Sequence, residues 1–483
     1  MYINDKILIG KNDNYEAYIL PRMANRHGII SGASGSGKTI SLKVLAESFS
    51  SAGVPVFLVD VKGDLAEMCL PGIVNDNISS RINNLNLENF EFKNFPTSFF
   101  DVYGKYGIPV RTTINSIGPK LLSRMLNLTE AQEGVLTIVF KIAEDENLEL
   151  IDLKDLRAIL AYVGERRKNY ALNYGNITLQ SIGSIQRNLL TLEDEGGNFF
   201  FGKPALDIND FIKTDINGTG YINILHAATL FQKPTLYASF LLWLLTDLYQ
   251  KLPEVGDLEK PKIAFFFDEA HLLFSEMPDY IIKQVTQIVK LIRSKGIGLY
   301  FISQSPSDIP DEILSQLGNR IQHVLRYYTK NDEKAIKAAA NSFRENPNYD
   351  TEQVIKTLKT GEALVSFQDE YGQPTVAEKV TILPPQSQIG TIDDIKRQEV
   401  IRNNPLYIKY INRTEEISAY EKIEQKIQNE KITQMSNVKN KSNSSKSSNK
   451  KSGLEKAANK VANSTLNTLG RKIGNSLFKS LFK

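Results

Sequence analysis

The chain has 483 residues, enough for two to four domains or for one large domain with insertions. Its net charge of +3 and its 41% hydrophobic and 23% charged residues are typical of a soluble globular protein. Its single cysteine, Cys69, excludes an intramolecular disulfide and a multi-cysteine metal site and suits a reducing compartment, and the four histidines show no metal-ligand spacing. Eleven lysines and arginines but one acidic residue follow residue 438, so the rest of the chain is mildly acidic and its total charge does not favour nucleic-acid binding.

The sequence shows neither a secretion signal nor a membrane-spanning segment. The first residues have no basic region followed by an apolar run, so we predict no signal peptide. The most apolar segment, residues 238–245, is far shorter than the roughly 20 residues that span a bilayer, and we expect a buried helix there. These features predict a cytoplasmic protein.

Short strand-like pieces in residues 1–27 lead to the main motif of the chain. Residues 32–39 match G-x-x-x-x-G-K-[ST], between an apolar strand at 28–31 and helical spacing at 39–49. Glycines let successive backbone N–H groups turn toward an anion, and the helix N-terminus adds its positive end. We therefore predict a phosphate-binding loop formed by Gly32, Ala33, Ser34, Gly35, Ser36, Gly37, Lys38, Thr39 and Ile40. Lys38 is expected to reach the β- and γ-phosphates, and Thr39 to hold Mg²⁺.

Polar residues follow the next predicted strand, residues 56–59. Asp60 and Asp64 lie where the carboxyl end of a parallel strand meets the ligand crevice, and both are candidates for contacts with Mg²⁺ or water. Asp64 has an alternative role as the cap of a helix that begins at Leu65.

Residues 75–220 predict a mainly helical insertion, with helices at 119–147, 152–163 and 178–195. Within it, Arg166-Arg167-Lys168 lies close to two tyrosines. This basic cluster predicts either a DNA contact or a solvated helix end.

The sheet is expected to resume at 221–225, before a long apolar helix at 235–249. Residues 263–267 then form an apolar strand that ends in Asp268 and Glu269, the Walker B pattern. Asp268 is predicted to hold Mg²⁺, directly or through water, and Glu269 to act as general base on the attacking water.

A helix at 280–294 precedes another apolar strand, residues 297–303. This strand ends at Gln304, which is placed to sense the γ-phosphate or to orient the water. Further strands are expected at 321–326 and, at an edge of the sheet, at 361–367. Strands separated by helices predict an α/β fold with a multi-stranded, mainly parallel sheet.

The C-terminal region changes in composition. Residues 386–435 predict charged helices, and residues 436–453 are rich in serine, asparagine and lysine and predict a disordered linker. Residues 454–483 recover an apolar stripe interspersed with lysines and predict a basic amphipathic helix. Such a helix binds a membrane, nucleic acid or a partner protein, or serves only as a solubilising tail; the first case would make the protein peripheral to the inner membrane.

Together these motifs resemble the HerA/FtsK-type P-loop ATPases, and more closely the stand-alone bacterial HerA-like helicase C-terminal family. The phrases that carry the resemblance are residues 23–28, 53–65, 268–274, 292–298, 303–306, 317–320 and 361–367. The resemblance implies a RecA-like core with an all-α insertion, ATP and Mg²⁺ as ligands, ATP hydrolysis, and a hexameric ring that acts on DNA. It also implies that an arginine from a neighbouring subunit completes the site. Arg293 and Arg320 match such arginines, and the alternative for each is an ion pair within its own subunit.

The resemblance also organises the chain into regions. We expect the ATPase core at residues 1–74 and 221–385, the helical insertion at 75–220, and the C-terminal helices, linker and amphipathic helix at 386–435, 436–453 and 454–483. HerA itself has an N-terminal β-barrel before its ATPase core, and the position of Gly32 predicts that this barrel is absent.

Three hypotheses about function follow. The first is an ATP-hydrolysing, hexameric DNA translocase or helicase-like motor. The second keeps the ATPase but assigns it to protein or pilus assembly at the membrane, with the C-terminal helix as anchor. The third is a slow ATP-binding switch or scaffold, against which Glu269 argues because a pure binder needs no general base.

Overall fold

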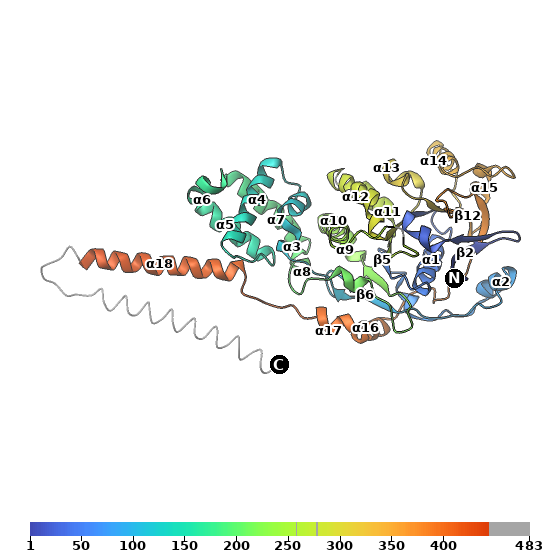
Figure 1. Ribbon diagram of the computed structural model, residues 1–483, viewed down its shortest axis with the longest axis horizontal. Helices are drawn as coiled ribbons and strands as arrows, with labels where there is room; N and C mark the ends of the chain where they lie inside the picture. The colour runs from blue at the N-terminus through green and yellow to red at the C-terminus, as the bar shows by residue number, and fades with distance from the viewer. Residues whose placement is uncertain (257, 277–278, 444–483) are drawn as a thin grey trace. The chain divides into compact units, whose positions relative to one another are not determined.

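The computed structural model describes residues 1–256, 258–276 and 279–443 (Figure 1). The chain divides into two compact units, Met1–Ile423 and Glu424–Lys483, and the first contains the sheet and the candidate site. The strands are β1 (Tyr2–Ile3), β2 (Lys6–Lys11), β3 (Glu16–Ile19), β4 (Gly28–Ser31), β5 (Val56–Asp60), β6 (Thr97–Asp101), β7 (Ile108–Pro109), β8 (Ile222–His226), β9 (Ile263–Phe267), β10 (Ile297–Ser303), β11 (Asn319–Gln322), β12 (Glu362–Ser366) and β13 (Glu378–Ile382). The helices are α1 (Lys38–Ser51), α2 (Asp76–Asn84), α3 (Ile114–Met125), α4 (Glu130–Asp145), α5 (Leu153–Glu165), α6 (Arg167–Tyr174), α7 (Leu179–Asp194), α8 (Gly197–Phe200), α9 (Ala228–Phe231), α10 (Pro234–Lys251), α11 (Ala270–Glu276), α12 (Asp279–Leu291), α13 (Asp311–Leu314), α14 (Lys330–Asn341), α15 (Thr351–Thr357), α16 (Asp394–Asn403), α17 (Pro405–Tyr410) and α18 (Ala419–Asn443).

The described strands form one sheet in the order β1-β2-β13-β12-β11-β4-β10-β9-β5-β8-β6-β7, with β3 paired to β2. From β11 to β7 the neighbouring strands are parallel. Strands β4, β5, β9 and β10 are buried at every position, which explains why they are continuous apolar runs rather than alternating ones. The predicted α/β fold with a mainly parallel sheet is confirmed.

The other end of the sheet is antiparallel. Strand β12 pairs with β11 on one side and with β13 on the other, and β13 pairs in turn with β2. The prediction of an edge strand at residues 361–367 was therefore wrong. Strands from the N-terminus cover this end of the sheet, and pairing between segments so distant in the chain leaves no local signal.

Aromatic packing holds α1 against the parallel strands. Phe266 on β9 and Tyr300 on β10 stack with ring centroids 4.9 Å apart. Phe49 near the end of α1 meets both rings edge-on, at 6.0 and 5.5 Å. Because edge-to-face and stacked rings add to the burial of apolar area, these contacts fix the helix whose N-terminus carries the predicted phosphate loop.

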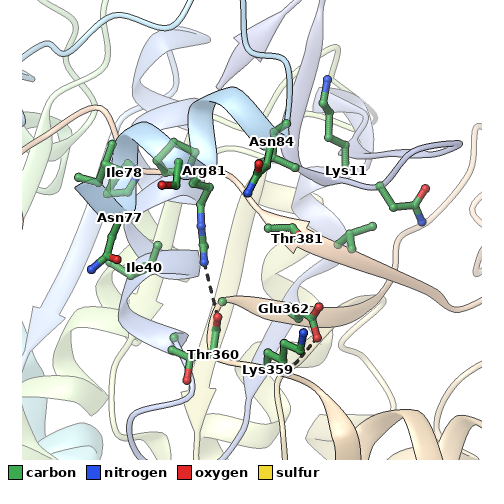
Figure 2. Close-up of a pocket in the computed structure, with 18 of the residues that line it drawn as sticks. Lys11, Ile40, Asn77, Ile78, Arg81, Asn84, Lys359, Thr360, Glu362 and Thr381 are labelled. Carbon is green, nitrogen blue, oxygen red and sulfur yellow. Dashed lines mark hydrogen bonds between the residues drawn. The ribbon is translucent and has the colours of Figure 1, made fainter. Parts of the chain in front are cut away.

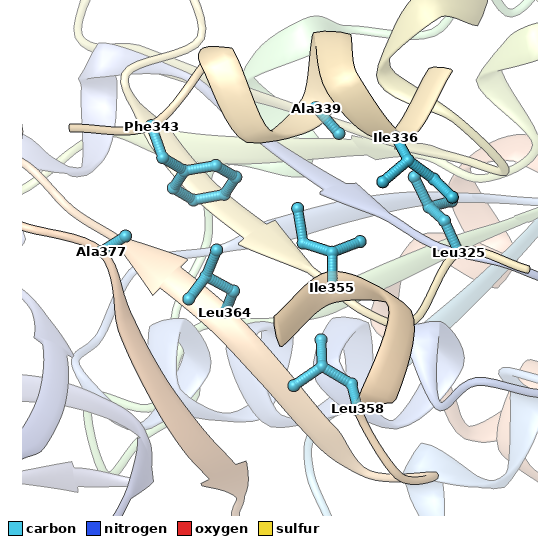
Figure 3. Packing of buried hydrophobic residues seen from close by; sticks show 8 residues of the cluster. All are labelled: Leu325, Ile336, Ala339, Phe343, Ile355, Leu358, Leu364 and Ala377. Carbon is cyan, nitrogen blue, oxygen red and sulfur yellow. The ribbon is translucent and has the colours of Figure 1, made fainter. Parts of the chain in front are cut away.

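Helices α14 and α15 pack on the antiparallel part of the sheet (Figure 3). Their shared core consists of Leu325, Ile336, Ala339, Phe343, Ile355, Leu358, Leu364 and Ala377. This cluster anchors the turn at residues 358–361, which leads from α15 into β12 and reaches the phosphate loop as described below.

Helices α3 to α8 lie between β7 and β8 in the chain, in the region predicted as a helical insertion. That region also contributes β6 and β7 to the main sheet. In the basic cluster, the guanidinium of Arg166 lies 4.2 Å from the centroid of the Tyr162 ring, an intramolecular contact where α5 ends. A DNA contact of this cluster stays a prediction.

The predicted buried helix at residues 238–245 is the middle of α10, where these eight residues are all buried. None of the helices in the described residues combines the length and apolar composition that crossing a bilayer requires. Helix α18 continues to Asn443, so the first residues of the expected disordered linker are helical, in keeping with the helix-forming lysine, glutamate and glutamine residues before them. The predicted amphipathic helix at 454–483 lies outside the described residues.

Candidate nucleotide-binding site

The phosphate loop connects β4 to α1 at the carboxyl end of the parallel strands. Gly37 has φ +114° and immediately precedes α1, so the chain enters the helix from a conformation that side chains rarely adopt. A Cβ at Gly32 would lie 2.5 Å from the Cβ of His323, so the loop also needs glycine for close approach. Ser34 and Gly35 form the exposed crest of the loop.

Two later segments hold the loop in place. Ala33 N–H donates to the carbonyl of Val324 at 2.8 Å, and Gly361 N–H donates to the carbonyl of Ser36 at 3.1 Å. The phosphate loop is thus fastened to the ends of the neighbouring strand β11 and of the turn before β12.

Beneath the loop lies His323, which the sequence did not single out. Burial lowers the pKa of His323 to about 4, so the ring is neutral at pH 7. Its Nδ1 lies 2.9 Å from the Glu362 carbonyl, which can only accept, so Nδ1 carries the hydrogen. Nε2 then accepts from the Ser41 hydroxyl at 2.8 Å, and the ring links α1 to β12.

Lys38, the first residue of α1, folds back over the loop. Its Nζ donates to the carbonyls of Gly32 and Ala33 at 2.6 and 3.1 Å. Burial lowers the pKa of Lys38, while the nearby carboxylates of Glu269, Asp268 and Asp308 oppose that shift.

Ser36 supplies a further polar group in the loop. Its Oγ is buried and has no hydrogen-bond partner among the described residues. A buried lysine and an unpartnered buried hydroxyl, on a glycine-rich loop that leads into a helix N-terminus, are donors of the kind that a phosphate chain requires.

Asp268 and Glu269 follow β9 beside this lysine. Asp268 Oδ1 accepts from Glu269 N–H at 2.9 Å, and burial, reinforced by the charge of Glu269, raises the pKa of Asp268 to about 7. Glu269 has φ +50°, an uncommon conformation for a residue other than glycine, and such conformations concentrate at functional sites.

The carboxylate of Glu269 contacts a lysine and lies near a histidine. Lys62 Nζ contacts Oε1, and His271 Nδ1 lies 3.2 Å from Oε2. Lys62 was missed in the sequence because its place depends on the pairing of β5 with β9, which aligns Val59 with Phe267.

Comparisons with known proteins identify the family of the chain. A family model described as "Helicase HerA-like C-terminal" matches residues 5–483. The chain belongs to this family. The resemblance drawn from the motifs is therefore confirmed.

The HerA-like chain is similar to two proteins named "DNA double-strand break repair helicase HerA". The match is 24% identical over 379 residues in Sulfurisphaera tokodaii and 24% over 368 residues in Sulfolobus acidocaldarius. In each case it covers 74% of this chain and 66% of the relative, so the chain spans about two thirds of their length.

Solved structures show the same fold. The plasmid coupling protein TrwB in complex with ADP and Mg²⁺ superposes with a TM-score of 0.52 at 13% identity, covering 78% of this chain and 89% of that one. The complex of TrwB with a non-hydrolysable ATP analogue gives 0.51 at 13% identity, covering 77% and 88%. The fold is thus that of a P-loop ATPase.

In this HerA-like site Asp60 has a structural role. Its carboxylate accepts from Gly63 N–H at 2.7 Å and Leu65 N–H at 3.3 Å, which shapes the loop that presents Lys62. Leu65, rather than Asp64, precedes the short helix Ala66–Cys69, and no side chain caps that helix. A contact of Asp64 with Mg²⁺ stays a prediction.

The remaining predicted residues are Gln304 and the two arginines. Gln304 is exposed directly after β10, and the nearby Asp308 carboxylate accepts from Ser303 Oγ at 2.6 Å. Arg320 donates from Nε to the Leu317 carbonyl and from Nη2 to the Leu314 carbonyl, both at 3.1 Å. It therefore ties the end of α13 to β11, which is an intrasubunit role but not the ion pair considered above. Arg293 is half-buried in the turn after α12.

A cavity of about 1020 Å³ opens beside the loop (Figure 2). Gly37 and Ile40 line it at the start of α1, α2 forms one wall, and the segment 359–362 forms another. Asp268, Glu269 and Lys62 are outside its lining.

Proposed function

We propose that this chain is an ATP-hydrolysing motor that works on DNA as a hexameric ring. The observation that carries the proposal is the proximity of the Lys38 ammonium to the carboxylates of Asp268 and Glu269. Membership of the HerA-like family and its similarity to proteins named DNA double-strand break repair helicases support the choice of DNA.

Each group has a defined task in the proposed reaction. The loop N–H groups and Lys38 bind the β- and γ-phosphates, and the Glu269 carboxylate accepts the proton of the attacking water. Thr39 and Asp268 would hold Mg²⁺, which neutralises charge on the phosphate oxygens. Gln304 would orient the water, and Arg293 or Arg320 would act on the site of a neighbouring subunit.

The contact between Lys62 and Glu269 belongs to the site without nucleotide. Lys62 Nζ lies against one of the two carboxylate oxygens that could accept the proton of the attacking water. Because the side chain of Lys62 is half exposed, it has room to turn into solvent when the nucleotide binds.

The test is the steady-state ATPase rate with and without double-stranded DNA at low and moderate salt, with Lys38→Ala as control. Stimulation that fades with salt is expected, because contacts with DNA phosphates release counterions. A rate that depends on Lys38 but is indifferent to DNA would refute the DNA part and leave an ATPase with another cargo. The alternative of a membrane motor for protein or pilus assembly depends on residues 454–483, which lie outside the described residues.

A further inference from the structure

The turn between β11 and α14 exposes two consecutive aromatic side chains. Tyr327 is 54% exposed and Tyr328 is 77% exposed. The Lys356 ammonium lies 6.0 Å from the centroid of the Tyr327 ring. Single exposed apolar side chains are ordinary on protein surfaces, but adjacent rings form a patch that a partner can cover. Because each ring carries a large apolar area, covering it would stabilise a complex.

The backbone of this turn is held in place from both ends. The Asp332 carboxylate accepts from Tyr328 N–H at 3.0 Å and from Thr329 N–H at 2.7 Å. Asp332 N–H donates in return to Thr329 Oγ1 at 3.3 Å, which caps α14. Before the turn, Leu325 packs in the same apolar cluster as Ile336 (Figure 3). A turn that is already ordered loses little conformational entropy when it binds a partner.

The exposed charge beside the rings is positive. Arg326 directly precedes the two tyrosines and Lys330 begins α14 after them, and both side chains are exposed. Asp332 lies close in the sequence, but its carboxylate is directed to the backbone N–H groups of the turn. Exposed rings between cations are the combination that binds single-stranded nucleic acid, since bases stack on the rings while the cations contact the phosphates.

Another turn of the chain provides an internal contrast. Tyr371, between β12 and β13, is 82% exposed. The residues before it are Asp369 and the exposed Glu370 rather than a cation. Negative charge of this kind repels phosphates. Exposure of a ring is therefore not sufficient for nucleic-acid binding, and the charge favours the turn at residues 326–330.

The same turn is continuous with a segment that holds the phosphate loop. The Val324 carbonyl accepts from Ala33 N–H at 2.8 Å, and His323 N–H donates to the Ser31 carbonyl at 2.7 Å. Only a short run of backbone separates these bonds from Tyr327. A ligand that prefers one position of the turn would therefore also bias the position of the phosphate loop.

We propose that residues 326–330 bind single-stranded DNA. Bases stack on the rings of Tyr327 and Tyr328, and the cations on either side contact the phosphates. The inference rests on the proposed function for the choice of DNA. It goes beyond that function because base stacking requires unpaired bases, which an intact duplex does not offer.

Fluorescence anisotropy with a fluorescein-labelled oligothymidylate of about 20 nucleotides measures the binding, because this length exceeds the site of a typical single-strand-binding fold. Tyr327→Ala and Tyr328→Ala should each weaken binding about 5- to 150-fold, whereas Tyr328→Phe keeps the ring and should bind as wild type does. The matched control Tyr371→Ala removes a similarly exposed ring and should change nothing. Unchanged affinity in both alanine variants, or the same loss in the control, would overturn the proposal.

The salt dependence separates stacking from phosphate contacts. Arg326→Ala should reduce the slope of log affinity against log salt concentration by about 0.7, because it removes one contact with a phosphate of a single strand. Tyr328→Ala should lower the affinity without altering that slope, and should leave the affinity for a duplex of the same length unchanged. An equal loss of duplex affinity in Tyr328→Ala would exclude base stacking and contradict the proposal.

Sedimentation velocity tests the other occupant of this patch, a second copy of the chain. The tyrosine variants should sediment as wild type does, and a changed oligomeric state with unchanged DNA affinity would overturn the proposal. A wild-type chain that binds no oligothymidylate, but whose ATPase responds to double-stranded DNA, would overturn this inference alone. Binding at the turn together with an ATPase that is indifferent to DNA would overturn the proposed motor alone.

Discussion

The substitution Glu269→Gln would separate the chemical role of Glu269 from its structural role. The side chain is 8% exposed, and its carboxylate lies between Lys62 and His271. An amide of the same shape keeps one oxygen as an acceptor, and glutamine experiences the same backbone strain at φ +50° as glutamate. The substitution therefore removes a charge and a proton acceptor while the geometry persists.

The two consequences differ in size. Lys62 has a side chain that is 48% exposed, so solvent screens the lost ion pair and the free energy of unfolding should fall by at most about 1 kcal/mol. Loss of a general base lowers turnover about 10²- to 10⁴-fold, which corresponds to roughly 2.7–5.4 kcal/mol in the transition state. Activity should thus be lost from a protein that is still folded.

Phosphate release in a single turnover measures the chemical step, and calorimetry with the ATP analogue AMPPNP and thermal unfolding report binding and folding. The matched control is Glu312→Gln, an exposed glutamate whose carboxylate pairs with Lys290 at 2.7 Å. We expect Glu269→Gln to bind AMPPNP with nearly wild-type affinity and the control to hydrolyse ATP normally. Turnover by Glu269→Gln within about tenfold of wild type would refute the assignment of Glu269 as general base.

Three further variants test the frame of the site. Gly37→Ala should lower the free energy of unfolding in urea by about 1–3 kcal/mol and weaken the binding of AMPPNP, because a side chain at φ +114° is strained. The control Gly134→Ala places its methyl group in open space on α4 and should not destabilise the protein. Equal losses of stability in the two variants would contradict this explanation. Arg320→Ala should lower the free energy of unfolding by about 1–3 kcal/mol through loss of its two carbonyl contacts, whereas unchanged stability would show that these bonds contribute nothing. His323 binds a proton at about pH 4 when folded and near its ordinary pKa of 6.5 when unfolded, so its contribution to stability is complete above pH 6.5 and declines as the pH falls toward 4. The thermal midpoint of wild type should decrease over that window, and His323→Gln should show a smaller decrease; identical profiles would exclude His323 as a cause.

The parts of the site that were predictable are contiguous in the chain. Residues 32–39 and the acids after β9 can be recognised from their local spacing and from the apolar strands that precede them. Lys62 and His323 were not predictable, because each acts through contacts between strands whose register depends on the whole sheet. Arg81 lies in a polar stretch without periodicity. Only the approach of α2 to Gly361 brings its guanidinium next to the segment that contacts the phosphate loop.

The same reason explains the error at β12. An alternating or apolar run shows that a strand exists, but its neighbours are chosen by segments elsewhere in the chain. Here Thr381 and Ile382 of β13 pair with Lys11 and Gly10 of β2. The fold class could be predicted from the order of elements, whereas the closing strands of the sheet could not.

The pairing of β4 has a consequence for how the protein becomes functional during synthesis. Its neighbours are β10 and β11, which emerge from the ribosome more than 260 residues after it. Non-local pairing of this kind delays folding, since the entropy of a long loop is lost before the contacts form. The first motif to be translated is therefore among the last to acquire its shape, and nucleotide affinity should arise only after residue 361 has been added. Binding of AMPPNP would then report on completion of the parallel part of the sheet, which includes β10 and β11, rather than on its N-terminal strands.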